Sequence, residues 1–178
     1  MFALIFGLSF LANAQDVQKD QPKGYQFTDI KRLPATSVKD QARAGTCWSW
    51  SGISFFESEM IRMGKEPIDL SAMYIVRHAY SDKATKFVRL HGNMNFAVGG
   101  AFCHVIKNYG IVPMDVYKGL NYGEPNHAFG EIDDVLAGYI NAVIKNSNKK
   151  LSTAWKKGFD GILDAYLGEE PEKFEYKG

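Results

Sequence analysis

The chain of 178 residues is poor in cysteine, carries no excess of either charge and has no apolar run long enough to cross a membrane. Two cysteines cannot form the framework of a disulfide-rich scaffold. The 21 basic and 20 acidic residues give a net charge of +1, which does not call for nucleic acid as a partner. His78 and His91 lack the spacing of metal ligands, and we expect no metal and no cofactor. The length allows one domain, or one domain and part of another.

The N-terminal residues 1–14 are apolar and end in Ala12-Asn13-Ala14, which fits a signal peptidase site. This stretch is too short to span a bilayer. We predict a signal peptide over residues 1–14, export to the periplasm or the medium, and no membrane span after cleavage. A buried N-terminal helix is the alternative. Residues 15–29 begin with a polar run that lacks an apolar period, and we interpret them as a flexible linker.

The segment from Gln41 to Trp50 has the composition of a site for a reactive thiol. Cys47 begins a helical pattern that runs to about Arg62, and a helix N-terminus favours thiolate over thiol. Gly45 allows close approach of the backbone. The side-chain amide of Gln41 and the backbone N–H of Cys47 would together form an oxyanion hole. A single cysteine on a helix is usually a buried core residue, but the residues around Cys47 favour the reactive interpretation.

The residues 38–41 and 45–50, Val-Lys-Asp-Gln and Gly-Thr-Cys-Trp-Ser-Trp, closely resemble the nucleophile segment of papain-like cysteine peptidases. Three later segments, 70–77, 99–102 and 109–113, resemble the bleomycin hydrolase and bacterial aminopeptidase C branch. The resemblance runs from about residue 30 to the C-terminus. Most secreted relatives have a disulfide-bonded cysteine where this chain has Ala44, and the bleomycin hydrolase branch also lacks that cysteine.

The resemblance implies an α+β papain-like fold, of which residues 30–178 would form the mainly helical lobe with helical insertions. It implies hydrolysis of peptide bonds through a thioester on Cys47, by an aminopeptidase whose substrates are peptides. Gln41 would hold the oxyanion and Trp48 would shield the site. Gly99 and Gly100 would pair with the substrate backbone. The resemblance also allows a homo-oligomer.

Apolar periodicity predicts four further helices after the one that begins at Cys47. Ser71 is the expected N-cap of the first, which reaches about Leu90, and Gly99-Gly100 opens the next, which ends near Asn108. We expect Cys103 on that helix to be a core residue. A stripe from Ile132 to Ile144 marks a fourth helix of the chain. The fifth is expected to be capped by Ser152 and ended by Gly168; its inward residues would be Trp155, Phe159, Ile162, Leu163 and Tyr166.

A base for Cys47 is missing from the pattern, since the family's histidine and asparagine lie about 130 residues or more beyond the cysteine. His127 follows Asn126 in a loop rich in glycine and proline, comes too early, and leads into a helix, so we reject it as the base. The chain is therefore expected to be the N-terminal part of a longer peptidase and nearly inactive alone. The alternatives are an inactive half-peptidase that binds peptide or a partner chain, and another thiol acyl-transfer enzyme such as an amidase or transglutaminase.

Overall fold

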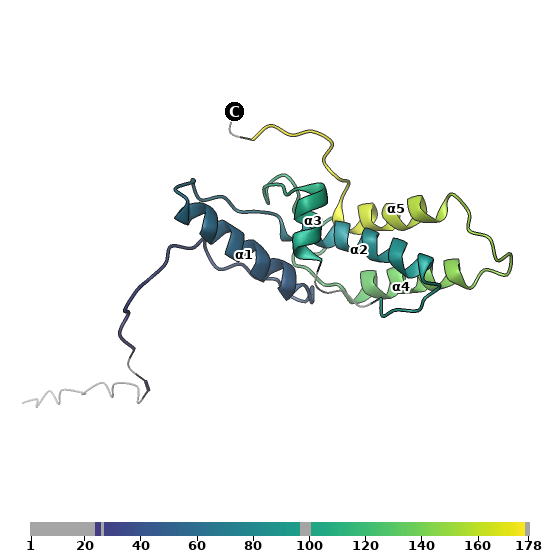
Figure 1. Cartoon of the computed structure of the whole chain (residues 1–178), viewed down its shortest axis with the longest axis horizontal. Coiled ribbons are helices and arrows are strands. Elements are labelled where there is room, and N and C mark those ends of the chain that lie inside the picture. Colours follow the sequence, from purple (N-terminus) through teal and green to yellow (C-terminus); the bar gives the residue numbers. More distant parts are fainter. Residues whose placement is uncertain (1–23, 26, 97–100, 177–178) are drawn as a thin grey trace, which may run out of the picture. The chain divides into compact units, whose positions relative to one another are not determined.

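The computed structural model describes residues 24–25, 27–96 and 101–176. The chain divides into two compact units, Met1–Arg32 and Leu33–Gly178. The expected signal peptide and most of the expected linker lie outside the described residues. In the described part, the second unit holds five helices and no strand (Figure 1): α1 (Cys47–Arg62), α2 (Ala72–Arg89), α3 (Phe102–Tyr109), α4 (Gly130–Ile144) and α5 (Trp155–Leu167). None of these helices is long and apolar enough to cross a bilayer.

Helix α2 is the central element, because it contacts each of the other four helices (Figure 1). Its sequence buries residues on all sides, including Ile75, Val76 and Ala79, as a helix surrounded by others requires. The predicted cap is confirmed: the backbone N–H of Tyr74 donates to the Ser71 hydroxyl oxygen at 3.0 Å. The Ser71 hydroxyl itself donates to the carbonyl of Tyr117 at 2.6 Å, which fixes the start of α2 against the loop that precedes α4.

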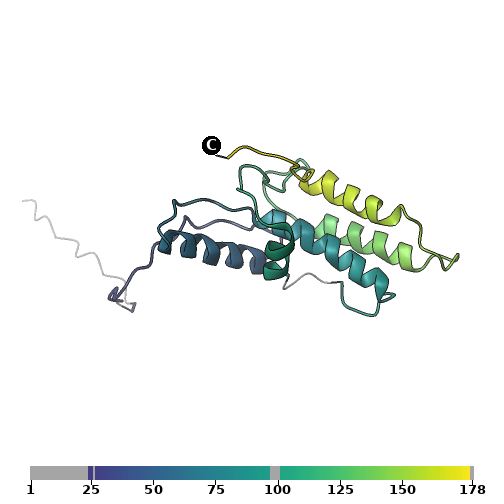
Figure 2. The same ribbon diagram turned by 45° about the horizontal axis from the view of Figure 1, so that its top comes forward.

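Helices α4 and α5 pack against each other and against α2, and Figure 2 shows the three side by side. The predicted apolar stripe of α4 is confirmed by the burial of Ile132, Leu136 and Ile140. On α5 the buried residues are Phe159, Leu163 and Leu167. This part of the fold is therefore held by apolar side chains at a spacing of four residues, the spacing that keeps one helix face inward.

The start of α5 differs from the prediction. Ser152 does not cap it; Ala154 is the N-cap residue, and the helix begins at Trp155. Ser152 is exposed, and the segment between α4 and α5 runs past it before the helix starts. The predicted end is confirmed, because Gly168 follows the last helical residue with φ of 94°, a conformation that favours glycine.

Helix α1 spans the predicted range but buries only Ser49, Ile53 and Glu57 completely. These residues lie four apart on the face that contacts α2. A second face, at Gly52, meets α3 so closely that a Cβ atom on Gly52 would lie 2.7 Å from the Phe102 ring. Phe56 packs edge-on against the same ring at a centroid distance of 5.4 Å. Helix α1 is thus fixed between α2 and α3.

The prediction that Cys103 is a core residue is wrong, because its side chain is exposed. Helix α3 packs through Phe102, Val105 and Ile106, and of these Val105 is fully buried. Cys103 lies two residues before Val105, which places it on the opposite side of a helix that turns 100° per residue. Cys103 is also the second residue of α3, so it lies in the first turn and not in the helix interior.

Candidate active site

Residues 40–46, which we call the nucleophile loop, connect the extended lead-in to α1. The loop turns tightly at its start: the Asp40 carboxylate accepts the N–H of Ala42 at 2.7 Å, and the carbonyl of Gln41 accepts the N–H of Ala44 at 3.2 Å. Ala42 has a φ of 49° and Gly45 a φ of 63°. Both residues have left-handed backbone conformations just before the helix begins. Gly45, which has no Cβ atom, lies at the position where we expected a close approach to the backbone.

The nucleophile loop is held from one side by the segment that leads into α4. The N–H of Arg43 donates to the carbonyl of His127 at 2.9 Å, and the N–H of Phe129 donates to the carbonyl of Arg43 at 3.2 Å. These two bonds form a parallel bridge between Arg43 and Ala128. The backbone of the loop is therefore tied to a part of the chain far away in sequence.

Cys47 is the first residue of α1, and its side chain is exposed. The carbonyl of Thr46 accepts the N–H of Ser49 at 2.9 Å and that of Trp50 at 3.3 Å. The Thr46 hydroxyl does not cap the helix; it accepts the indole N–H of Trp50 at 3.1 Å. Within the described part of the chain, neither the thiol nor the backbone N–H of Cys47 has a hydrogen-bond partner. The sulfur thus lies beside an unused amide at the positive end of a helix dipole.

Gln41 and Trp48, the expected neighbours of the thiol, are both half-buried. The Oε1 atom of Gln41 and the indole Nε1 atom of Trp48 are buried without a hydrogen-bond partner among the described residues. Buried polar atoms are nearly always satisfied, so such exceptions call for an explanation; five more of them occur among the described residues, all outside residues 40–50. Gly99 and Gly100, the expected substrate-binding glycines, lie outside the described residues.

None of the four histidines, all of which are among the described residues, forms a hydrogen bond with Cys47. The Nε2 atom of His78 lies 3.1 Å from the Glu170 carboxylate and its ring stacks on Tyr109, while His104 lies 3.3 Å from the Asp82 carboxylate. His91 is exposed. Among the interactions between described residues, none joins a histidine to Cys47. The site as described therefore contains a thiol and hydrogen-bond donors but no assigned base.

His127 packs with its ring against Trp50, at a centroid distance of 6.2 Å, and edge-on against Phe129 at 6.1 Å. Its Nδ1 atom is buried without a partner among the described residues. Burial lowers the pKa of His127 below the ordinary value of 6.5 because it disfavours the charged imidazolium. In this structure the residue contributes its backbone carbonyl to the nucleophile loop and its ring to the packing of α1.

Comparison with known proteins decides the family. The family model described as papain family cysteine protease matches residues 22–158. The chain belongs to the papain family of cysteine proteases. The match includes the nucleophile loop, helices α1 to α4 and the start of α5. No curated protein matches the chain in a search of full sequences.

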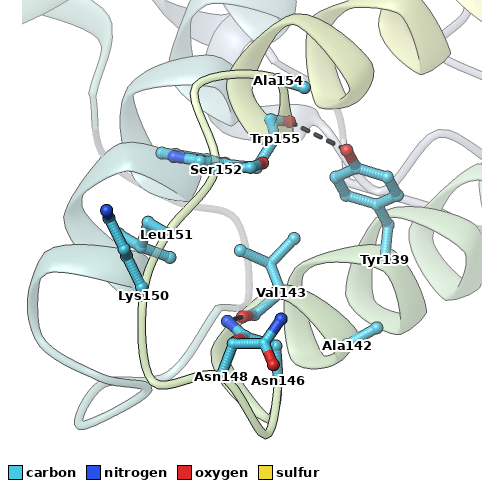
Figure 3. Close-up of a pocket in the computed structure, with 10 residues that line it drawn as sticks. All are labelled: Tyr139, Ala142, Val143, Asn146, Asn148, Lys150, Leu151, Ser152, Ala154 and Trp155. Carbon is cyan, nitrogen blue, oxygen red and sulfur yellow. Dashed lines mark hydrogen bonds between the residues drawn. The ribbon is translucent and has the colours of Figure 1, made fainter.

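Two cavities of this papain-family protease have similar sizes and different surroundings. One, of about 300 Å³, is lined by Asp40, Trp50 and His127 among others, and so adjoins the nucleophile loop. The other, of about 360 Å³, lies between the end of α4 and the start of α5 (Figure 3). The Tyr139 hydroxyl donates there to the carbonyl of Trp155 at 3.0 Å, the dashed line in the figure. None of the predicted site residues lines this second cavity. We therefore do not assign it to the candidate active site.

One residue that is bonded to the lead-in of the nucleophile loop was missed by the sequence analysis. Glu57 on α1 has a fully buried side-chain carboxylate that bonds to the lead-in of the nucleophile loop. A signal was present: Glu57 lies four residues after Ile53, on the face that must turn inward. Among the described residues, no group of three or more histidine, cysteine, aspartate or glutamate side chains is arranged to hold a metal ion.

Proposed function

We propose that Cys47 is the nucleophile of a cysteine peptidase that hydrolyses peptide bonds. The observation that carries the proposal is an exposed thiol on the first residue of α1, next to a backbone N–H that no described residue uses. Membership of the papain family supports a cysteine peptidase acting on peptides.

The proposed reaction has two steps. The Cys47 sulfur attacks the carbonyl carbon of the peptide, and the negative oxygen that forms accepts hydrogen bonds from the Cys47 N–H and the Gln41 side-chain amide. The carbon–nitrogen bond then breaks, the amine leaves with the proton that the Cys47 thiol gave up, and a thioester remains. Water attacks the thioester, which releases the acid and restores the thiol. Trp48 shields the sulfur, and Gly99 and Gly100 pair with the peptide backbone.

We further propose that the protein is an aminopeptidase of the bleomycin hydrolase and aminopeptidase C branch. Its support is the likeness of residues 70–77, 99–102 and 109–113 to that branch, together with Ala44 in place of a disulfide cysteine. Ala44 is buried in the nucleophile loop, with no side chain that could be crosslinked. The same proposal includes a homo-oligomer.

The base and its orienting asparagine come, in this proposal, from residues that follow position 178 in the complete reading frame. The histidines support it, because none of the interactions between described residues joins one of the four histidines to Cys47. A positioned acid–base partner contributes about 10²–10⁴-fold in rate, against about 0.3–1 kcal/mol from a helix dipole. The 178-residue chain is therefore expected to be nearly inactive.

The test is an assay with aminoacyl-coumarin substrates on two proteins, the 178-residue chain and the product of the complete reading frame. Turnover is expected from the longer protein and abolished by Cys47→Ala. Cys103→Ala is the matched control, since Cys103 is also exposed and also in the first turn of a helix. Full activity of Cys47→Ala would contradict the proposal. Turnover by the short chain would instead point to His127, and His127→Ala would be the next variant.

A second candidate is a non-catalytic protein that binds peptides or a partner chain, favoured by the lack, among the described residues, of any hydrogen bond between Cys47 and a histidine. It predicts saturable peptide binding by the complete protein without turnover, at equal strength in the wild type and in Cys47→Ala. Isothermal titration with the same peptides separates it from the peptidase.

The N-terminus gives a separate proposal, that residues 1–14 are a signal peptide, residues 15–29 a linker, and the protein is exported. Its support is the apolar stretch that ends in Ala12-Asn13-Ala14. N-terminal sequencing of the protein from its host should begin at Gln15. An intact Met1 on protein from the cytoplasm would overturn it.

A further inference from the structure

Glu57 presents a fully buried carboxylate on the helix that begins with Cys47. The exposed fraction of its side chain is 0%. Such burial is costly for a charge unless the group is paired and its oxygens accept hydrogen bonds. Glu57 meets both conditions, and its partners come from two other segments of the chain.

The first set of partners lies in the lead-in to the nucleophile loop. The Lys39 ammonium donates to Oε2 of Glu57 at 2.8 Å, and the Thr36 hydroxyl donates to the same oxygen. Lys39 also donates to Thr36 at 3.2 Å and pairs with Asp69 at 2.7 Å. Burial alone would lower the pKa of Lys39, but the bonds to Asp69 and Glu57 outweigh it and raise that pKa, so the lysine stays charged.

The second partner is the backbone just before α2. The N–H of Leu70 donates to Oε1 of Glu57 at 2.8 Å, and Leu70 forms an isolated bridge with Pro113. One carboxylate therefore joins the lead-in, α1 and the entry to α2.

Both ends of the nucleophile loop are attached to the same helix, α1. The loop starts directly after Lys39, which is bonded to Glu57, and it ends at Cys47. Both ends of residues 40–46 are therefore anchored to α1, and Gln41 lies between the two anchors. A change in the position of Lys39 relative to α1 would move Gln41 relative to Cys47.

We propose that Glu57 is a positioning residue of the active site: its buried carboxylate, bonded to Thr36, Lys39 and the Leu70 amide, holds Gln41 at the correct place beside Cys47. The inference rests on the proposed function, because it assigns to Gln41 the role of oxyanion donor. Apolar residues of similar volume often replace buried ion pairs without loss of stability, so stability alone does not account for a charge at this position.

Hydrogen exchange on the 178-residue chain tests the structural half of the proposal without any need for turnover. Glu57→Gln is expected to speed exchange in residues 36–46 and to leave α2 and α4 unchanged. The matched control is Glu59→Gln, on the same helix, where the carboxylate is partly exposed and pairs with Arg62 at 2.8 Å. Faster exchange of equal size in all helices, or no change in residues 36–46, would overturn the proposal.

A double-mutant cycle on the complete protein tests the catalytic half. Removal of one oxyanion donor costs about 10²–10³-fold in kcat, so Gln41→Ala should do so in the wild type. If Glu57 acts through Gln41, Glu57→Gln should lower kcat by about tenfold with little change in KM, and Gln41→Ala should then cost about tenfold less than in the wild type. All rates are expressed per active site, titrated with a peptide-like inhibitor that alkylates Cys47, in the Cys103→Ala background, so that unfolded protein and the second exposed thiol do not count.

Independent effects, in which the two losses multiply, would overturn the proposal. Thr36→Val is the second variant, because it removes one donor to Glu57 and keeps the shape and the charges. Thr36→Val should lower kcat by a smaller factor, and Gln41→Ala should again cost less in this variant than in the wild type. If Glu57→Gln does not fold, the cycle with Thr36→Val is the test of the proposal. Failure of the proposed function has a different signature, which is turnover that persists in Cys47→Ala.

Discussion

Two helices of this protease bury side chains with the same spacing and opposite chemistry. On α1 the buried stripe is Ser49, Ile53 and Glu57; on α4 it is Ile132, Leu136 and Ile140. Both repeat every four residues, and both face the central part of the fold. The α4 stripe is entirely apolar, whereas two of the three residues in the α1 stripe are polar.

The two stripes contribute in different ways: the α4 stripe stabilises the fold, and the α1 stripe fixes the position of the helix that carries Cys47. The free energy of apolar burial is roughly proportional to buried area and has no preferred direction, so the α4 stripe stabilises the fold without bonds of a defined angle. The Ser49 hydroxyl donates to the carbonyl of Ala72 at 2.8 Å, and Glu57 accepts the Leu70 amide at 2.8 Å. Hydrogen bonds weaken steeply when distance or angle changes. The helix that carries Cys47 is thus fixed in place by directional bonds.

The largest effect is expected in the apolar region. Phe159→Ala removes a fully buried ring from α5 and should lower the free energy of unfolding by about 3–5 kcal/mol. Urea denaturation measures it. Alkylation of Cys47 by iodoacetamide under native conditions should stay unchanged, because α5 does not contact α1. A large change in that alkylation rate would show that the two regions are not separate.

A smaller effect is expected where α1 meets α3. Gly52→Ala places a Cβ atom 2.7 Å from the Phe102 ring, and such overpacking costs about 1–3 kcal/mol. The control is Gly138→Ala on α4, where a Cβ meets nothing within 4 Å and alanine should stabilise the helix by up to about 1 kcal/mol. Thermal denaturation of the two variants should therefore shift in opposite directions. Equal shifts would contradict this account of the α1–α3 contact.

The hydroxyl of the α1 stripe comes next. Ser49→Ala loses the bond to Ala72 and should lower the free energy of unfolding by about 1 kcal/mol. Ser58→Ala, which removes an exposed hydroxyl from the same helix, should have a smaller effect. Chemical denaturation of both variants makes the comparison. If Ser49→Ala cost no more than Ser58→Ala, the polar stripe would not hold α1 in place.

The smallest effect is a dependence on pH that involves His127. Burial lowers the pKa of His127 in the folded chain below the ordinary 6.5. As the pH falls below about 6.5, the unfolded chain therefore takes up a proton that the folded chain refuses. Stability contributed by this residue is complete above that pH and declines below it, by at most about 1.4 kcal/mol per pH unit.

His127→Leu should flatten the decline in stability between pH 6.5 and 5.5 (an interval of about one unit, chosen from the ordinary pKa of histidine). His91→Asn is the control, since His91 is exposed and has a φ of 51°, which asparagine tolerates. Denaturation midpoints across this interval measure the effect. An unchanged slope in His127→Leu would show that the buried imidazole takes no part.

The parts of the fold that the sequence predicted are those with local signals. The bounds of α1 and the cap of α2 were predicted correctly because both depend on local patterns, and the Ser71 hydroxyl acts on a residue three positions away. Ser152 has the right chemistry for a cap but does not act as one, since α5 begins at Trp155, whose carbonyl accepts the Tyr139 hydroxyl of α4. The exposure of Cys103 depends on which face of the short helix α3 packs, and an eight-residue pattern does not determine that face.

The candidate site shows the same division. The position of Cys47 at the mouth of a helix follows from adjacent residues and is confirmed by the bounds of α1. The bridge between Arg43 and Ala128 joins distant segments, which no local pattern reports. Glu57 was missed because a glutamate on an amphipathic helix is normally solvated, and its partners Thr36 and Leu70 become visible only in three dimensions.

The bridge at Arg43 also matters for anyone who would transplant this motif into another scaffold. Residues 41–50 carry the cysteine and its neighbours, but the shape of their loop depends on a carbonyl and an amide supplied by His127 and Phe129. A grafted decapeptide would bring the reactive group without those two contacts. A working transplant would have to include the stretch from Thr36 to Leu70 and a second strand-like segment that offers the same pair of backbone groups to the host.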